Sequence, residues 1–446
     1  MEKKIFIKTF GCQMNEYDSN RIFDSVKRLG FIKSEDQANT DCYVLNTCHI
    51  RDKAKEKVYH EIGRIKKLYK KKNKPIMIVA GCVAQAENQE MIKREPYVDV
   101  VIGPQSYHKI NKILSNFDKN KKEDETEFDT IAKFDLLAKT KNLDSNVSAF
   151  LTIQEGCDKF CNFCVVPFTR GPECSRPFKK IIMEAEQLIK NGAREITLLG
   201  QNVNAYNYKE KNFEYKISNL LNELEKYSEL KRIRYTTSHP KDMDNELINC
   251  YKHATKLMPI LHLPVQSGSN KVLKNMNRKH SRDEYLKIIE NLIKVRPNIK
   301  FSSDFMVGYP GETDNDFKET ITLIKRVNFI NSYSFIYSPR PGTPASNLET
   351  LEANILKNRL KILQDTLEKI QINKNKSEIG KVLEVLVENK MKNQNKFFGR
   401  SEDSTPVIFT KGVESDVGKV VSIVIRDCNR NSLFGEKSSV ASGVAA

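Results

Sequence analysis

The chain has 446 residues, which is too long for one ordinary hydrophobic core and predicts two or three domains. Hydrophobic residues make up 39% and charged residues 29%, and these values exclude collagen-like, low-complexity and mostly disordered proteins. No apolar run reaches the roughly 18 residues of a membrane span, and the N-terminus lacks a signal-peptide pattern, so we expect a cytoplasmic protein without a membrane partner. The net charge of +17 favours a nucleic acid partner, although a lysine-rich composition typical of AT-rich genomes explains part of the excess.

The first segment repeats one pattern three times. Strand-like stretches at 5–10, 42–47 and 76–80 lead into Cys12, Cys48 and Cys82, and helical stretches at about 19–29 and 53–71 lie between them. Alternating strands and helices predict a parallel sheet, whose strands place their carboxyl ends along one edge where ligands bind. The three cysteines are therefore expected to converge. The alternative is that each is a small buried residue at a tight strand exit.

Beyond residue 116 the pattern changes twice. Residues 117–146 are polar with dense mixed charge and predict a linker. The next segment alternates again, and its strand candidates are 149–154, 195–199, 232–236, 260–263, 300–307 and 332–337. About six such β/α units predict a partial or complete parallel barrel with its active site at the carboxyl ends of the strands. Residues 377–437 are β-rich and predict a small barrel or sandwich, followed by a flexible tail at 438–446.

The most specific feature follows the first barrel strand. Cys157, Cys161 and Cys164 are spaced so that three thiolates can surround one side of an iron–sulfur cube. A 4Fe-4S cluster normally has four cysteine ligands, so three leave one iron open to chelate a small molecule. Zinc is the main alternative, but a closed zinc site needs a fourth ligand, and the nearest spare cysteine is Cys174. A redox pair of Cys161 and Cys164 would leave Cys157 without a role.

This CxxxCxxC motif, with the aromatic Phe163 before its third cysteine, resembles the signature of radical S-adenosylmethionine (SAM) enzymes. Other segments resemble the methylthiotransferases among them, namely NTCHIR at 46–51, GCVAQ at 81–85, VPFTRG at 166–171, LHLPVQSGS at 261–269 and GYPGET at 308–313. The resemblance runs nearly end to end. It implies an α/β chain with an N-terminal cluster-binding domain at 1–116, a TIM-like radical-SAM (β/α) barrel at 147–376 and an all-β TRAM domain at 377–437.

The resemblance also implies the chemistry. Cys157, Cys161 and Cys164 would hold one 4Fe-4S cluster with SAM on its open iron. Cys12, Cys48 and Cys82 would hold a second 4Fe-4S cluster, which carries the sulfur that another SAM methylates before its transfer.

The segment LGQNVNAY at 199–206 resembles the family branch that acts on isopentenylated adenosine in tRNA. The resemblance then implies methylthiolation of the C2 carbon of that adenosine at tRNA position 37. Its partners would be the tRNA anticodon stem-loop, an external electron donor and a sulfur source, and we expect a monomer. The rivals are the same chemistry on threonylcarbamoyladenosine or on a ribosomal protein, and a non-catalytic RNA-binding protein with zinc-bound cysteines.

Further residues are candidates for binding the two substrates. The residues expected near SAM follow predicted barrel strands, or could pair with the carboxylate of SAM. They are Phe163, Gly200, Gln201, Asn202, Gln266, Ser267, Arg278, Asp304 and Gly308. Lys396 and Arg400 in the terminal β-domain are expected to contact RNA, whereas the neighbouring Phe397 and Phe398 are more readily core residues than RNA contacts. We assign no ligand role to His49, His262, Cys174 or Cys428, and we expect Cys42 and Cys250 to be buried thiols.

Overall fold

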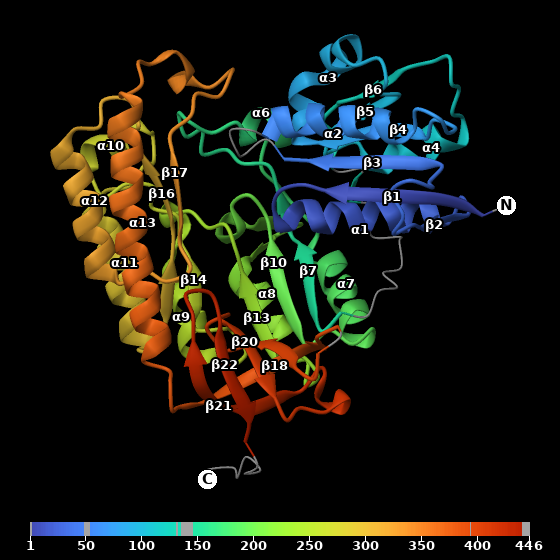
Figure 1. Cartoon of the computed structure of the whole chain (residues 1–446). Coiled ribbons are helices and arrows are strands. Elements are labelled where there is room, and N and C mark those ends of the chain that lie inside the picture. Colours follow the sequence, from blue (N-terminus) through green and yellow to red (C-terminus); the bar gives the residue numbers. More distant parts are fainter. Residues whose placement is uncertain (1, 49–53, 131–132, 135–145, 393, 439–446) are drawn as a thin grey trace.

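The computed structural model describes residues 2–48, 54–130, 133–134, 146–392 and 394–438. Figure 1 shows three bodies in chain order, with the N-terminal sheet at one corner, a central α/β domain and a small β-barrel at the opposite end. This arrangement confirms the expected fold class. In the described part of the chain, every helix is too short or too polar to cross a membrane.

The N-terminal domain is built on one parallel sheet of order β2-β1-β3-β4-β5-β6. Its strands are β1 (Lys3–Thr9), β2 (Phe31–Lys33), β3 (Cys42–Thr47), β4 (Ile76–Gly81), β5 (Val100–Ile102) and β6 (Glu123–Glu125). Helices cover both faces. They are α1 (Gln13–Lys27) and α4 (Ile110–Ser115) on one face, and α2 (Ala54–Leu68) and α3 (Cys82–Arg94) on the other. Because both faces are covered, the central strand β3 is fully buried, and its first four residues, Cys42 to Leu45, are apolar.

Two predictions for this region were wrong in detail. The first helix begins at Gln13, directly after Cys12, and not near residue 19. The predicted linker supplies β6, which pairs with β5 and extends the sheet. As an edge strand, β6 pairs on one side only and is half-buried. Its three residues are acidic, so it lacks the apolar alternation by which strands are predicted. Lys109 pairs with Glu125 of this strand at 2.6 Å.

The central domain is an arc of parallel strands in chain order. The strands are β7 (Ser148–Thr152), β10 (Glu195–Leu199), β13 (Arg232–Tyr235), β14 (Ile260–His262), β15 (Lys300–Ser302), β16 (Asp304–Val307) and β17 (Tyr333–Ile336). The helices outside them are α7 (Phe178–Lys190), α8 (Ile217–Leu224), α9 (Asn245–His253), α11 (Arg282–Val295), α12 (Asp314–Val327) and α13 (Ala353–Lys376). The strand predicted at 300–307 is interrupted at Ser303, so that β15 pairs with β14 and β16 pairs with β17.

The barrel is partial. Among the described strands, none joins β17 to β7, and α1 of the N-terminal domain packs against β7 instead. Met14 and Tyr17 of α1 share a small apolar cluster there with Phe150 and Leu199. The helix α1, which begins directly after Cys12, therefore docks the N-terminal domain onto the central one.

The remaining elements surround the carboxyl ends of the central strands or form the last domain. The former are β8 (Gln154–Glu155), α6 (Val166–Arg170), β9 (Cys174–Ser175), the hairpin β11 (Asn207–Glu210) and β12 (Phe213–Lys216), and α10 (Asn270–Asn275). The latter are β18 (Val382–Lys390), β19 (Phe397–Arg400), β20 (Pro406–Thr410), β21 (Val420–Cys428) and β22 (Leu433–Lys437), which close into a barrel of order β18-β19-β20-β22-β21. Phe397 lies in the core of this barrel.

Candidate active site

Three strand ends of the N-terminal sheet bring Cys12, Cys48 and Cys82 to one edge. The parallel register pairs Thr9 of β1 with Asn46 of β3, and Thr47 of β3 with Gly81 of β4. The arrows of β1 and β3 in Figure 1 point toward the central domain, so this edge faces it.

The backbone at Gly11 brings two of these cysteines together. Gly11 has φ +115°, and a Cβ atom there would lie 2.3 Å from the Cβ of Cys48. Only glycine tolerates both this conformation and this approach. A hydrogen bond with the Cys48 side chain, together with the positive charge of Arg170, outweighs desolvation and lowers the pKa of the half-buried Cys12 thiol to about 6. Cys12 is thus readily ionised, as a metal-binding cysteine must be.

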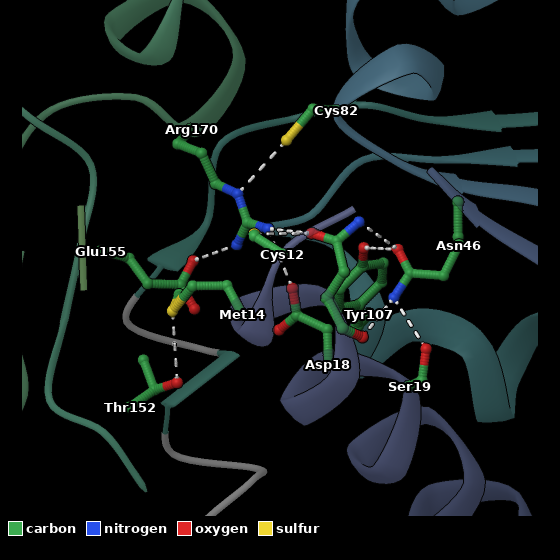
Figure 2. A network of polar contacts seen from close by, with 12 residues as sticks. Cys12, Met14, Asp18, Ser19, Asn46, Cys82, Tyr107, Thr152, Glu155 and Arg170 are labelled. Carbon is green, nitrogen blue, oxygen red and sulfur yellow. Dashed lines mark hydrogen bonds and ion pairs between the residues drawn. The ribbon is translucent and has the colours of Figure 1, made fainter. Parts of the chain in front are cut away.

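Arg170, at the end of α6, enters this edge from the central domain (Figure 2). Its Nε donates to Cys82 Sγ at 3.4 Å, and its Nη2 donates to Asp18 at 3.0 Å and to Asn15 at 3.2 Å. Its Nη1 lies 3.4 Å from a carboxylate oxygen of Glu155. Burial lowers the pKa of Arg170, but the nearby Cys82 and the two carboxylates outweigh it and raise that pKa well above its usual value.

Two asparagines hold the first two cysteine loops together. Asn15 Nδ2 donates to the carbonyls of Phe10 and Thr47, each at 2.9 Å, and so ties the end of β1 to the end of β3. Asn46 Nδ2 returns a hydrogen bond to the carbonyl of Asn15 at 2.8 Å. Both side chains are fully buried, so these bonds are not exchanged with water.

The second cysteine trio lies on the loop after β8. Gly156 precedes it with φ +77°, and a Cβ atom there would lie 1.8 Å from the carbonyl oxygen of Pro172. The Gly156 N–H donates to Gln201 Oε1 at 2.6 Å, while Gln154 Oε1 accepts from the backbone N–H groups of Gln201 and Asn202 at 3.0 and 3.1 Å. The loop that carries Cys157 is thereby fastened to the loop after β10.

The thiols of this trio are poorly solvated. Burial raises the pKa of Cys157 to about 11 and that of Cys164 to about 12. Arg278 Nη1 lies 3.5 Å from Cys161 Sγ and places a positive charge beside this trio. Because thiols must lose their protons to bind iron, the arginine and the metal itself have to stabilise the thiolates here.

Several predicted SAM-binding residues surround this loop with unpaired polar atoms. Asn202 Oδ1, Gln266 Oε1 and Arg278 Nε are buried and have no hydrogen-bond partner among the described residues. Buried polar atoms are rarely left without partners, so these atoms fit a polar ligand such as SAM. Gln266 also has φ +74°, a strained conformation of the kind found at binding sites.

Other predicted SAM-binding residues contact the protein itself. Ser267 Oγ lies 3.3 Å from Thr320 Oγ1, and Asp304 lies 3.6 Å from His262. A Cβ atom at Gly308 would collide with the side chain of Leu356, and one at Gly200 would lie 2.6 Å from Gln154 Oε1. Phe163 packs against the apolar cluster that includes Met276. Their contacts with SAM stay predictions.

Sequence reasoning missed two histidines beside Arg278. His239 and His280 are buried, their ring centroids lie 5.8 Å apart, and neither Nε2 has a partner among the described residues. Burial, and then the charge of Arg278, lowers the pKa of His280 to about 4. A neutral imidazole can donate or accept a hydrogen bond, so both rings can bind a polar ligand.

The residues expected to contact RNA lie at the other end of the central domain. Arg232, at the amino end of β13, donates to the backbone carbonyl of Ser401 beside Arg400 at 3.1 Å. The Arg400 side chain pairs with Glu388 at 3.0 Å, whereas Lys396 is exposed. Their RNA contacts stay predictions.

Other cysteines and histidines received no ligand role from the sequence. Cys42 and Cys250 are buried, as expected. Cys174 lies on β9, where it pairs with Glu155 in the β8–β9 ladder. His49 lies outside the described residues. In the described part of the chain no three His, Cys, Asp or Glu side chains converge closely enough to bind a single metal ion, whereas in a 4Fe-4S cube each thiolate binds a different iron.

The residues around Arg170 were also missed. Asn15 and Asp18 lie three and six residues after Cys12. This helical spacing places both side chains on the face of α1 that lies below Cys12. From the sequence, this spacing could have identified Asn15 and Asp18 as neighbours of Cys12. Nothing local predicts that Arg170 and Glu155, from the other domain, meet them.

Three family models match successive parts of the chain. They are described as "Uncharacterized protein family UPF0004" at residues 4–103, "Radical SAM superfamily" at 151–324 and "TRAM domain" at 376–437. Among solved structures, the radical S-adenosylmethionine methyltransferase TsrM from Kitasatospora setae has a TM-score of 0.55 at 12% identity, over 78% of this chain and 77% of that one. The S-adenosylmethionine radical enzyme OxsB has a TM-score of 0.52 at 11% identity, over 82% of this chain and 56% of that one. Both are similar in fold.

Curated relatives are much more similar in sequence. A tRNA-2-methylthio-N(6)-dimethylallyladenosine synthase of Pelagibacter ubique is 64% identical over 98% of each chain. A protein of the same name from Wolbachia pipientis is 48% identical over 97% of this chain and 99% of its own. Another from Rickettsia rickettsii is 47% identical over 98% of this chain and 100% of its own.

Proposed function

The chain belongs to the family of tRNA-2-methylthio-N(6)-dimethylallyladenosine synthases, which are radical SAM enzymes, and on that premise we propose that it methylthiolates isopentenylated adenosine in tRNA. The reaction replaces the hydrogen on C2 of the adenine at tRNA position 37. The observation that carries the proposal is the 64% identity, which extends over 98% of both chains and includes all three domains. The alternatives, which are threonylcarbamoyladenosine or a ribosomal protein as substrate and a non-catalytic RNA-binding protein, have no comparable support.

Amino-acid side chains alone cannot activate the C2–H bond of adenine for this reaction. The C2–H bond of adenine is not acidic enough for a general base to ionise. When bound, a 4Fe-4S cluster and SAM supply radical chemistry that breaks such bonds, while the protein supplies orientation and excludes water. Cys157, Cys161 and Cys164 are the residues that would hold this cluster.

Residues around that trio would position SAM. Asn202 and Gln266 offer buried unpaired oxygens to its polar groups, and Arg278 offers a guanidinium nitrogen to its carboxylate. The hydrogen bonds among Gln154, Gln201 and Gly156 keep the loop in place, so little reorganisation is needed on binding.

A second 4Fe-4S cluster at Cys12, Cys48 and Cys82 would carry the sulfur to be methylated. The convergence of these cysteines at one sheet edge, the low pKa of Cys12 and the approach of Arg170 from the central domain support this assignment. The reaction then needs an external electron donor and a sulfur source. The net charge of +17 and the exposed Lys396 support binding of the tRNA anticodon stem-loop. We propose that the chain binds it as a monomer.

Nucleoside analysis tests the proposal directly. tRNA from a strain that lacks this gene should contain isopentenyladenosine without its methylthio group, and expression of the chain should restore the modified nucleoside. The anaerobically reconstituted protein should contain about eight irons per chain, four for each cluster. Methylthiolation of threonylcarbamoyladenosine or of a ribosomal protein instead, or a zinc-bound protein without iron, would contradict it.

A further inference from the structure

Arg170 follows one cysteine trio along the chain and contacts a thiol of the other. The proposed reaction gives it no role. Arg170 ends α6, the helix that follows Cys164, and its side chain reaches Cys82 of the other trio. We propose that Arg170 is a positioning residue that orients Cys82 and raises the reduction potential of the cluster bound there. This inference rests on the proposed second cluster.

Two carboxylates and a lysine hold the guanidinium. Asp18 accepts from Lys133 with one oxygen and from Arg170 with the other, at 3.2 and 3.0 Å. Glu155 likewise contacts Lys133 through Oε1 and Arg170 through Oε2. Each carboxylate therefore bridges the same two cations, and this arrangement fixes the plane of the guanidinium.

The surroundings leave Arg170 little freedom. The side chains of Asp18, Glu155 and Lys133 are fully buried, and that of Arg170 is 3% exposed. Gln105 Nε2 adds hydrogen bonds to Glu155 at 2.8 Å and to the backbone carbonyl of Arg170 at 2.9 Å. With Nη1 and Nη2 committed to the carboxylates, the Nε–H is directed at Cys82 Sγ.

The charges explain why this contact matters. Lys133 and Arg170 carry two positive charges, and Asp18 and Glu155 carry two negative ones, so the network is neutral before the cysteines ionise. Hydrogen bonds to the cysteine sulfurs and exclusion of solvent are two of the factors that set the potential of an iron–sulfur cluster. A donor on Cys82 stabilises the more negative, reduced cluster and thus raises its potential.

The experiment isolates the second cluster. In the full-length chain, Cys157→Ala, Cys161→Ala and Cys164→Ala together remove the ligands of the first cluster, so the reconstituted protein should keep about four irons. A redox titration followed by electron paramagnetic resonance then gives the potential of the remaining cluster. We expect a shift to more negative potential in Arg170→Gln and a smaller shift in Arg170→Lys, which keeps the charge without the fixed Nε–H. Glu155→Gln removes a negative charge and should shift the potential the opposite way.

Arg278→Gln in the same background is the matched control, because Arg278 is also buried but lies beside the other trio. Its potential should equal that of the parent. An unchanged potential in Arg170→Gln, with four irons retained, would overturn the inference. If Arg170→Gln cannot retain iron, Arg170→Lys decides: an unchanged potential there overturns the inference, and a negative shift supports it. Absence of iron from the parent triple variant would instead refute the second cluster itself, and with it the proposed sulfur delivery.

Discussion

Arg232, the first residue of β13, donates a hydrogen bond from its guanidinium to the backbone carbonyl of Arg400 in the terminal barrel at 2.5 Å. Further bonds from the same guanidinium reach the carbonyls of Ser401 and Glu384 at 3.1 and 2.9 Å. A buried cation thus fastens the TRAM barrel to the amino ends of the central strands, opposite the cysteine loops.

Removing this cation should loosen the terminal barrel. Arg232→Ala removes three hydrogen bonds between the central domain and the terminal barrel, and we expect a loss of roughly 2–4 kcal/mol in the free energy of unfolding. Limited proteolysis should release the terminal barrel from this variant first. Lys231→Ala, which changes the exposed neighbour, is the control and should behave like the parent. An unchanged denaturation midpoint in Arg232→Ala would show that the bonds contribute little.

Lys396 provides a test of RNA binding by the terminal barrel. Lys396→Glu should weaken tRNA binding several-fold at low salt and reduce the dependence of affinity on salt, because a phosphate contact releases a counterion. Lys294→Glu makes the same charge change at an exposed site on α11 and should affect binding less. Arg400 suits this test less well, since its loss also leaves Glu388 without its partner. Equal effects of the two lysine variants, measured by filter binding, would indicate general electrostatics only.

Gly156 should be required for the first cluster. Gly156→Ala places a Cβ atom 1.8 Å from the carbonyl oxygen of Pro172, so the loop that carries Cys157 has to move. We expect the iron content to fall from about eight to about four per chain and SAM cleavage to be lost. Gly311→Ala is the control, because Gly311 has a similar φ of +80° with nothing within 4 Å of the added atom. The cost of Gly311→Ala is the backbone strain alone, about 1–2 kcal/mol.

Gly11 should be required for the second cluster in the same way. A Cβ atom in Gly11→Ala would lie 2.3 Å from that of Cys48, which separates Cys48 from Cys12. We expect the loss of about four irons, while SAM cleavage at the other trio continues without methylthio product. Gly30→Ala, at φ +81° with open space around it, should keep all the iron. If Gly11→Ala retained its iron and its product, these three cysteines would not be cluster ligands held in this geometry.

The alternation of strands and helices predicted much of this arrangement. It placed Cys12, Cys48 and Cys82 at the carboxyl ends of neighbouring strands, because parallel strands share one direction whatever their side chains. It failed at β6, where an edge strand needs no apolar alternation, and at the start of α1, where three of the first four helical residues are polar. It also predicted one strand where the interruption at Ser303 separates β15 from β16.

The sequence by itself determined the number and spacing of the thiolates and the order of the three domains, because ligand spacing and periodicity are local properties of the chain. Only the tertiary structure decided that Arg170 reaches Cys82, that Asp18 and Lys133 meet Glu155, and that the terminal barrel lies at the amino ends of the central strands. These contacts join residues distant along the chain, and they depend on how buried charges from different domains find partners when the domains pack. No local pattern encodes that pairing.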